Sequence, residues 1–288
     1  MGMGDSNGLQ SFSDLPAVRL TTVGGSRAII LQQGAHVVSW VPAGLGEQLY
    51  LSPKSAFQPG QAVRGGVPVI FPQFAERGPY GRHGFARTQI WALDSVESRA
   101  EEAVARLRLV DTEQTRSLWP HRFELILTVR LRDRSLEMTL ECHNTGLESF
   151  DFTAALHTYL GVDQLEQTCV YGLEGVRFQD SARVGEDGVQ GPKPIQPAGE
   201  WDRIYWNAQS PLELREQAGG SLRRVAIRQQ GFQDVVVWNP GPEKCAALKD
   251  MPADGYQRML CIEAAQIAAP VRLAPGQAWI GGQILQVL

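Results

Sequence analysis

Apolar and polar side chains alternate with a period of two along much of this chain. In residues 135–144, for example, Leu136, Met138, Leu140 and Cys142 alternate with polar or charged neighbours. Side chains of a β-strand point alternately to its two faces, so this pattern predicts a strand that is buried on one side. Similar strand candidates cover residues 17–23, 26–41, 101–110, 122–131, 150–160, 223–229, 234–240, 258–267 and 278–288.

The segments between these strands carry turn sequences such as NTG, GPE, ADG and PGQ, and helical periodicity is almost absent outside residues 111–119. The pattern predicts an all-β fold of mostly antiparallel strands, a large β-sandwich or super-sandwich. The chain shows neither a fixed repeat nor a compositional linker. We therefore predict one domain over residues 15–288, preceded by a flexible tail over residues 1–14.

The composition limits which classes of protein this chain can belong to. The chain has 288 residues, of which 43% are hydrophobic and 20% charged, which is typical of a folded protein with a sizeable core. The net charge of −4 argues against a nucleic-acid partner, and an anionic substrate would need a local basic patch. The sequence contains no apolar run of bilayer length and no signal-peptide pattern at its start, so we expect no membrane partner. The cysteines form no C-x-x-C pair, which favours reduced thiols and a cytoplasmic location.

A turn-rich segment, residues 64–87, is the candidate for that basic patch. Its glycines let the backbone turn tightly and its prolines stiffen the path. Arg64, Arg82 and Arg87 each offer a planar fork of donors that suits phosphate or carboxylate, and His83 lies among them. The alternative interpretation is that the arginines are solvated surface charges and the histidine is a turn residue.

Two further titratable residues lie in apolar strand sequences. His157 follows the apolar run of FTAALHTYLGV, and Glu263 lies inside RMLCIEAAQIAAP. A buried, unpaired carboxylate is costly, so Glu263 is a candidate functional group. A solvent-facing glutamate and a hydrogen-bonded core histidine are the structural alternatives, and spacing alone cannot bring the two residues together. The remaining histidines share no metal-ligand spacing with another histidine or a cysteine, so we predict no metal site.

Seven motifs in this order, RGGVPVIFPQF, HGFAR, LWPHRFEL, LHTYL, WDRIY, VVWNP and MLCIEAAQI, resemble those of the hexose-6-phosphate mutarotases, or glucose-6-phosphate 1-epimerases. That family belongs to the aldose 1-epimerase superfamily. The resemblance runs from about residue 15 to the C-terminus. It implies a galactose-mutarotase-like β-sandwich with a sugar-binding cleft on one concave sheet.

The resemblance also implies roles for individual residues. The catalytic histidine of the family falls on His157 and its catalytic carboxylate on Glu263. Substrate-contacting positions fall on a set that lies mostly in the basic segment: Arg64, Arg82, His83, Arg87 and Asp202. Arg82 departs from the uncharged polar residue of the family pattern, so it either adds a third cation for the phosphate or points away. A turn-capping aspartate is the structural alternative for Asp202.

Interconversion of anomers requires ring opening, for which one base and one acid suffice. We expect Glu263 to take the proton of the C1 hydroxyl and His157 to protonate the ring oxygen, from opposite sides of the anomeric centre, without metal or redox cofactor. The implied partner is a small sugar phosphate, and we expect a monomer or weak oligomer. Two alternatives remain: an aldose 1-epimerase for free sugars, and a non-catalytic carbohydrate-binding protein.

Overall fold

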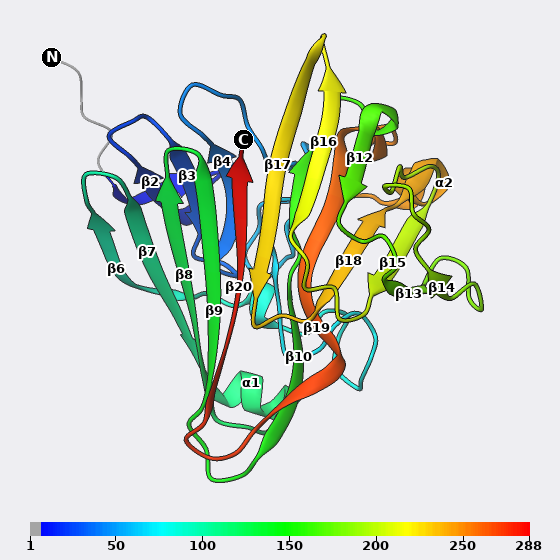
Figure 1. The fold of residues 1–288 in the computed structure, drawn as a ribbon. Helices are drawn as coiled ribbons and strands as arrows, with labels where there is room; N and C mark the ends of the chain where they lie inside the picture. The colour runs from blue at the N-terminus through cyan, green and yellow to red at the C-terminus, as the bar shows by residue number, and fades with distance from the viewer. Residues whose placement is uncertain (1–6) are drawn as a thin grey trace, which may run out of the picture.

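A computed structural model describes residues 7–288, which form three antiparallel sheets (Figure 1). Sheet A, at the N-terminus, has four strands in the order β1-β2-β3-β4. Its strands are β1 (Gly8–Phe12), β2 (Leu15–Thr21), β3 (Arg27–Leu31) and β4 (His36–Val41). Of the flexible tail predicted over residues 1–14, residues 1–6 lie outside the described residues, and the rest needs correction, because residues 8–12 form backbone ladder bonds with β2.

Sheet B has eight strands, seven of them in the order β14-β13-β15-β18-β19-β10-β5, with β11 paired to β19. Its strands are β5 (Val69–Ile70), β10 (Phe150–Leu156), β11 (Tyr159–Gly161), β13 (Arg177–Asp180), β14 (Gly188–Val189), β15 (Trp201–Tyr205), β18 (Asp234–Asn239) and β19 (Met259–Leu273). The residues of β18 and the first nine of β19 are all buried, which explains their nearly continuous apolar sequences.

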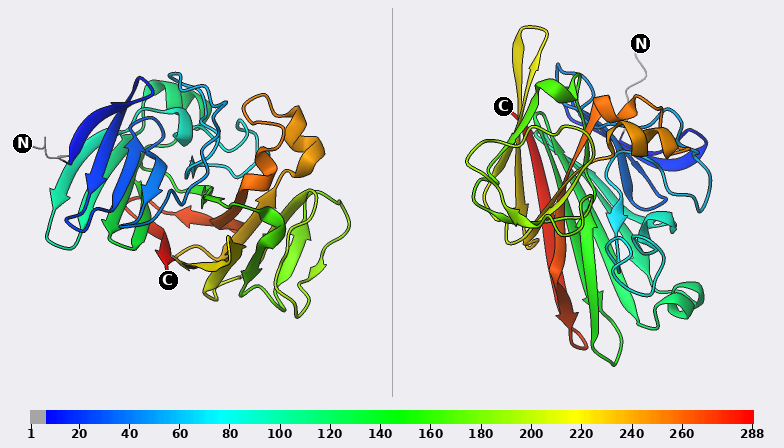
Figure 2. Two further views of the ribbon diagram at one scale, coloured as in Figure 1. Left: turned by 90° about the horizontal axis from the view of Figure 1, so that it is seen from above. Right: turned by 90° about the vertical axis from the view of Figure 1, so that its right-hand side faces the viewer.

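Sheet C has eight strands in the order β12-β16-β17-β20-β9-β8-β7-β6. Its strands are β6 (Ala92–Ser98), β7 (Ala103–Val110), β8 (Phe123–Arg132), β9 (Ser135–Asn144), β12 (Thr168–Tyr171), β16 (Leu212–Ala218), β17 (Ser221–Gln230) and β20 (Ala278–Val287). The β16–β17 hairpin projects beyond its neighbours (Figure 2).

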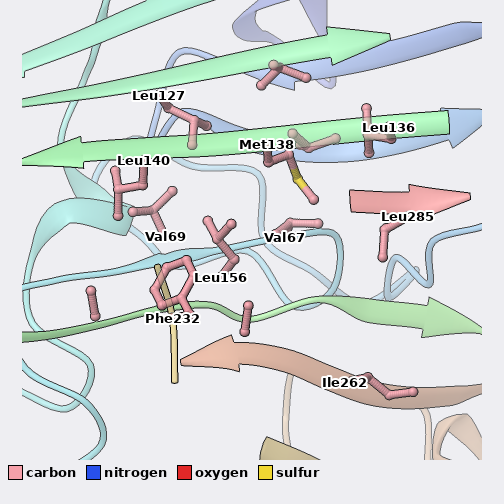
Figure 3. Close-up of a cluster of buried hydrophobic side chains, with 14 of the residues drawn as sticks. Val67, Val69, Leu127, Leu136, Met138, Leu140, Leu156, Phe232, Ile262 and Leu285 are labelled. Carbon is pink, nitrogen blue, oxygen red and sulfur yellow. The ribbon is translucent and has the colours of Figure 1, made fainter. Parts of the chain in front are cut away.

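The main core lies between sheets B and C. Leu127, Met138 and Leu285 of sheet C face Leu156 and Ile262 of sheet B, and all five are 0–1% exposed (Figure 3). In β9, the alternating residues predicted to share one face are all buried. The period-two pattern thus records a sandwich in which strands such as β9 bury one face, and the all-β prediction is confirmed.

Helices are few and short: α1 (Glu113–Leu118), α2 (Gly241–Ala247), and the single 3₁₀ turns η1 (Ala86–Thr88), η2 (Leu165–Gln167) and η3 (Gly255–Arg258). The predicted helix near residues 111–119 is present as α1, whose first turn is capped by the side chain of Thr112. Over residues 7–288, no helix has the length and apolar character needed to cross a membrane. The four cysteines are free thiols.

Candidate active site

Four strands of sheet B build the floor of a cavity through their register. One row across the sheet runs from Asp202 on β15 to Trp238 on β18, then through Cys261 on β19 to Tyr159 on β11. The neighbouring row includes Glu263, which is two residues from Cys261 and therefore on the same face. Side chains from distant parts of the sequence thus point into one space.

His157 reaches this floor because the chain leaves the regular ladder between β10 and β11. Its backbone amide donates to the carbonyl of Pro68 at 3.0 Å, in the basic segment. The imidazole stacks on the ring of Tyr159, with centroids 4.8 Å apart and planes 12° apart, and meets Trp238 edge-on at 6.1 Å. Aromatic contacts on two sides fix the orientation of the ring.

His157 and Glu263 are in direct contact. The Nε2 atom of His157 and the Oε1 atom of Glu263 lie 3.4 Å apart, and the side chains are 10% and 1% exposed. The expectation that these groups lie on opposite sides of the anomeric centre is therefore wrong, because they lie side by side on one wall. Two adjacent groups can face the C1 hydroxyl and the ring oxygen together, since both oxygens are bonded to the same carbon.

Burial opposes the charged form of each group. Burial raises the pKa of the Glu263 carboxyl well above its usual value, and the charge of Asp202 adds to this shift. Burial also lowers the pKa of the His157 imidazole, and the nearby His83 and Arg64 add to that shift. Burial therefore favours the neutral form of the pair, a protonated carboxyl beside a neutral imidazole. His157 Nδ1 and Glu263 Oε2 are buried with no hydrogen-bond partner among residues 7–288.

His83 forms the adjoining wall. Its φ of +65° turns the chain so that the ring meets His157 edge-on at 5.5 Å and Phe74 at 5.2 Å. Its Nδ1 accepts the amide proton of Ala75 at 3.2 Å, which leaves the ring proton on Nε2. Burial, aided by the positive charge of Arg87, lowers the pKa of His83 to about 3, so this histidine is a neutral donor at pH 7.

Arg64 and Arg87, at the two ends of the basic segment, both line the cavity. Arg64 donates to Tyr159 Oη at 3.1 Å and forms an ion pair with Asp250 at 3.1 Å. Arg87 donates to the backbone carbonyl of Arg82 at 2.9 Å, and its Nε is buried without a partner among the described residues. Buried donors without acceptors are rare unless a ligand supplies the acceptor.

The other two predicted contact residues differ in character. The Arg82 side chain lines the cavity but is 57% exposed and pairs with Glu76 at 3.4 Å. Asp202 is half-buried in the floor, and burial raises its pKa to about 6. All seven sequence-predicted site residues therefore line one cavity.

The cavity has a volume of about 460 Å³ and is lined by five cationic and three acidic side chains. This balance provides the local basic patch that the acidic chain would need for an anionic ligand. A larger cavity of about 810 Å³ lies beside Gln48 and Arg223, and among residues 7–288 no histidine lines it. Nor do these residues contain a group of three or more His, Cys, Asp or Glu side chains that could hold a metal ion.

Sequence reasoning did not single out several polar residues at the site, among them Tyr159, Asp250 and Lys244. Tyr159 could have been found, because it is two residues from His157 and a strand places such neighbours on one face. Asp250 and Lys244 lie in or near α2, where no periodic pattern indicates a direction.

The sequence model of the aldose 1-epimerase family matches residues 16–286. A protein of Escherichia coli K12 named "Putative glucose-6-phosphate 1-epimerase" is 37% identical over 241 residues, covering 83% of this chain and 79% of that protein. A protein of Cenchrus ciliaris with the same name is 34% identical over 262 residues, covering 88% and 79%.

Two solved structures have the same fold as this chain. The crystal structure described as a "putative mutarotase (YeaD)" from Salmonella typhimurium superposes with a TM-score of 0.89 at 31% identity, covering 97% of this chain and 92% of that one. A galactose 1-epimerase from Lactobacillus acidophilus, at 14% identity, shares the fold with a TM-score of 0.73 and 98% coverage of both chains.

Proposed function

The chain belongs to the aldose 1-epimerase family, and from that premise we propose that it interconverts the α and β anomers of hexose 6-phosphates. The observation that carries this proposal is one cavity in which a buried His157–Glu263 pair adjoins Arg64 and Arg87. The pair supplies an acid and a base, and the guanidinium groups supply charge for a phosphate.

In the proposed reaction, Glu263 takes the proton of the C1 hydroxyl while His157 gives a proton to the ring oxygen. The bond between C1 and the ring oxygen breaks, and C1 becomes an aldehyde. After rotation about the C1–C2 bond, the ring oxygen attacks the other face of C1. His157 takes its proton back, and Glu263 returns a proton to the former carbonyl oxygen. Positioned proton transfers of this kind contribute about 10²- to 10⁴-fold in rate.

His157 and Glu263 together hold one transferable proton throughout this cycle. Before ring opening the pair consists of a carboxylate and an imidazolium, and while the sugar is open it is neutral. Burial by itself favours the neutral pair. A phosphate bound by Arg64 and Arg87 offsets the positive charge near His157, so a phosphorylated ligand favours the charged pair that begins the reaction.

The same arginines account for the choice of substrate. A phosphate monoester carries close to two negative charges at neutral pH. A hydrogen bond to a charged group contributes about 1.5–3 kcal/mol, so two arginines favour the phosphorylated sugar by about 10²- to 10⁴-fold. His83 and Asp202 are suited to sugar hydroxyls, since one is a neutral donor and the other an acceptor that would repel phosphate.

Anomer exchange followed by NMR, with glucose, glucose 6-phosphate and galactose 6-phosphate, tests the proposal. We expect acceleration of the phosphorylated sugars, and loss of most of it in His157→Asn and Glu263→Gln. The matched controls are the same substitutions in a half-buried pair outside the cavity, His143→Asn and Glu141→Gln, whose Nε2 and Oε2 atoms lie 3.3 Å apart. Near-normal rates in either site variant would refute the acid and base roles.

Substrate choice is tested by Arg64→Met and Arg87→Met. We expect both variants to lose far more activity toward glucose 6-phosphate than toward glucose, because only the phosphorylated sugar uses the guanidinium groups. Arg272→Met, which removes a surface ion pair with Asp151 at 3.1 Å, is the control. Equal losses for both sugars would assign the arginines a structural role. Wild-type acceleration of free sugars alone would make the protein a free-aldose epimerase.

A further inference from the structure

The hydroxyl of Tyr159, a residue that lines the cavity, can donate one further hydrogen bond. Its oxygen accepts a hydrogen bond from Arg64 at 3.1 Å, and a guanidinium group has no acceptor to offer in return. Burial raises the pKa of this hydroxyl, so it keeps its proton at neutral pH. Within residues 7–288 no acceptor lies within hydrogen-bond distance of that proton, and Tyr159 lines the cavity.

Arg64 is oriented by contacts on both sides of its guanidinium. Its Nε and a terminal nitrogen each lie 3.1 Å from Oδ2 of Asp250, while the other terminal nitrogen bonds Tyr159. The backbone carbonyl of Asp250 accepts a hydrogen bond from Ser52 at 2.6 Å, and Ser55 bonds the backbone of Arg64 at 2.9 Å. Asp250 thus directs one face of the guanidinium toward Tyr159.

These contacts place two donors side by side in residues that line the cavity: the Arg64 guanidinium and the Tyr159 hydroxyl. An anionic oxygen that meets Arg64 there also meets an O–H group whose only free role is to donate. Hydrogen bonds from a hydroxyl to a charged oxygen are short and strong, so this arrangement suits a phosphate oxygen better than a sugar hydroxyl.

We propose that Tyr159 is a phosphate-binding residue, donating its hydroxyl proton to the phosphate that Arg64 contacts, and that Asp250 is the positioning residue that orients Arg64 for both. The proposal rests on the proposed function, since it identifies the substrate's phosphate as the ligand. It adds a neutral donor and a carboxylate to a binding site otherwise made of arginines.

The test measures binding of inorganic phosphate by calorimetry, alongside the kinetics of glucose 6-phosphate. Tyr159→Phe keeps the ring that stacks on His157 and removes only the donor. We expect the Kd for phosphate and the KM for glucose 6-phosphate to rise by about 10- to 100-fold, with the loss in KM rather than in kcat. The matched control is Tyr205→Phe, which removes a buried hydroxyl bonded to Gln190 at 3.0 Å, outside the cavity.

Asp250→Asn tests the positioning role through a double-mutant cycle. We expect it to weaken phosphate binding in the wild-type background and to have no further effect in an Arg64→Met background, because it acts through that guanidinium. A merely structural aspartate would lower binding equally in both backgrounds and would refute its role.

The phosphate measurements separate this proposal from the proposed function. Wild-type protein that binds phosphate more tightly than Tyr159→Phe protein, yet does not accelerate anomer exchange, would refute the proposed function and still support Tyr159 as a phosphate-binding residue. Wild-type protein that binds no phosphate, or Tyr159→Phe protein that binds it as tightly as wild type, overturns the proposal. Thermal unfolding of each variant shows whether a loss of binding comes from a loss of fold.

Discussion

Gln283 links sheets B and C directly beneath the candidate active site. Its Oε1 accepts a hydrogen bond from Thr158 Oγ1 at 2.5 Å, and its Nε2 donates to the carbonyl of Ile262 at 3.0 Å. The amide of Ile262 donates to Thr158, but the amide of Thr158 donates to Leu156 instead of returning the bond. Gln283 therefore supplies the donor that the break between β10 and β11 removes.

We expect Gln283→Leu to lower the free energy of unfolding by about 2–6 kcal/mol. Thr158 is 0% and Gln283 is 1% exposed, so water cannot replace the lost partner. The substitution leaves the hydroxyl of Thr158 and the carbonyl of Ile262 unsatisfied, and each such group costs about 1–3 kcal/mol. Leucine fills most of the glutamine volume, so the cavity term is small. Thr158 and Ile262, which are next to the candidate acid and base, lose their hydrogen bonds to Gln283, so kcat should fall as well.

Urea unfolding followed by tryptophan fluorescence measures this loss as a lower midpoint at unchanged slope. In a Thr158→Val background the same substitution leaves one unsatisfied group instead of two, so its additional cost should be smaller by about 1–3 kcal/mol. Gln286→Leu, at a half-buried position of the same strand, is the control. A loss below about 0.5 kcal/mol, the level of ordinary surface substitutions, would refute the reasoning.

Two further predictions concern stability. The folded-state pKa of Asp202, raised to about 6, makes a contribution to stability that is fully present below the unfolded value of about 3.9 and is lost as pH rises through about 6. Urea unfolding across that range should show Asp202→Asn lacking this decline, and an unchanged profile would contradict it. Gly66→Ala should destabilise more than Gly60→Ala: both have positive φ, but a Cβ at Gly66 would lie 2.3 Å from the carbonyl of Val37, whereas at Gly60 nothing lies within 4 Å. Equal melting temperatures of the two variants would refute this comparison.

The fold could be predicted from periodicity where a strand buries only one face. In β8 and β9 the alternation of side chains matches the alternation of burial almost residue by residue. The pattern failed at the sheet edges: in β6 no residue is fully buried, and β14 has only two residues. Such strands form because the neighbouring strand has unpaired backbone N–H and C=O groups. This cause cannot be read from their own sequences.

Residue chemistry alone indicated most of the candidate site residues, but their roles, and Asp202, came only through resemblance, since the geometry of the site depends on register. Periodicity shows that His157 and Glu263 lie in apolar segments, but only the pairing of β10 and β11 with β19 brings them within 3.4 Å. Asp250 and Gln283 are harder still, because one lies in a turn and the other looks like a polar position on an ordinary strand. Each acts on a partner from a different part of the chain, so no local pattern could distinguish it from a surface residue. Residues that hold a site in place are therefore found by accounting for every buried donor and acceptor around it.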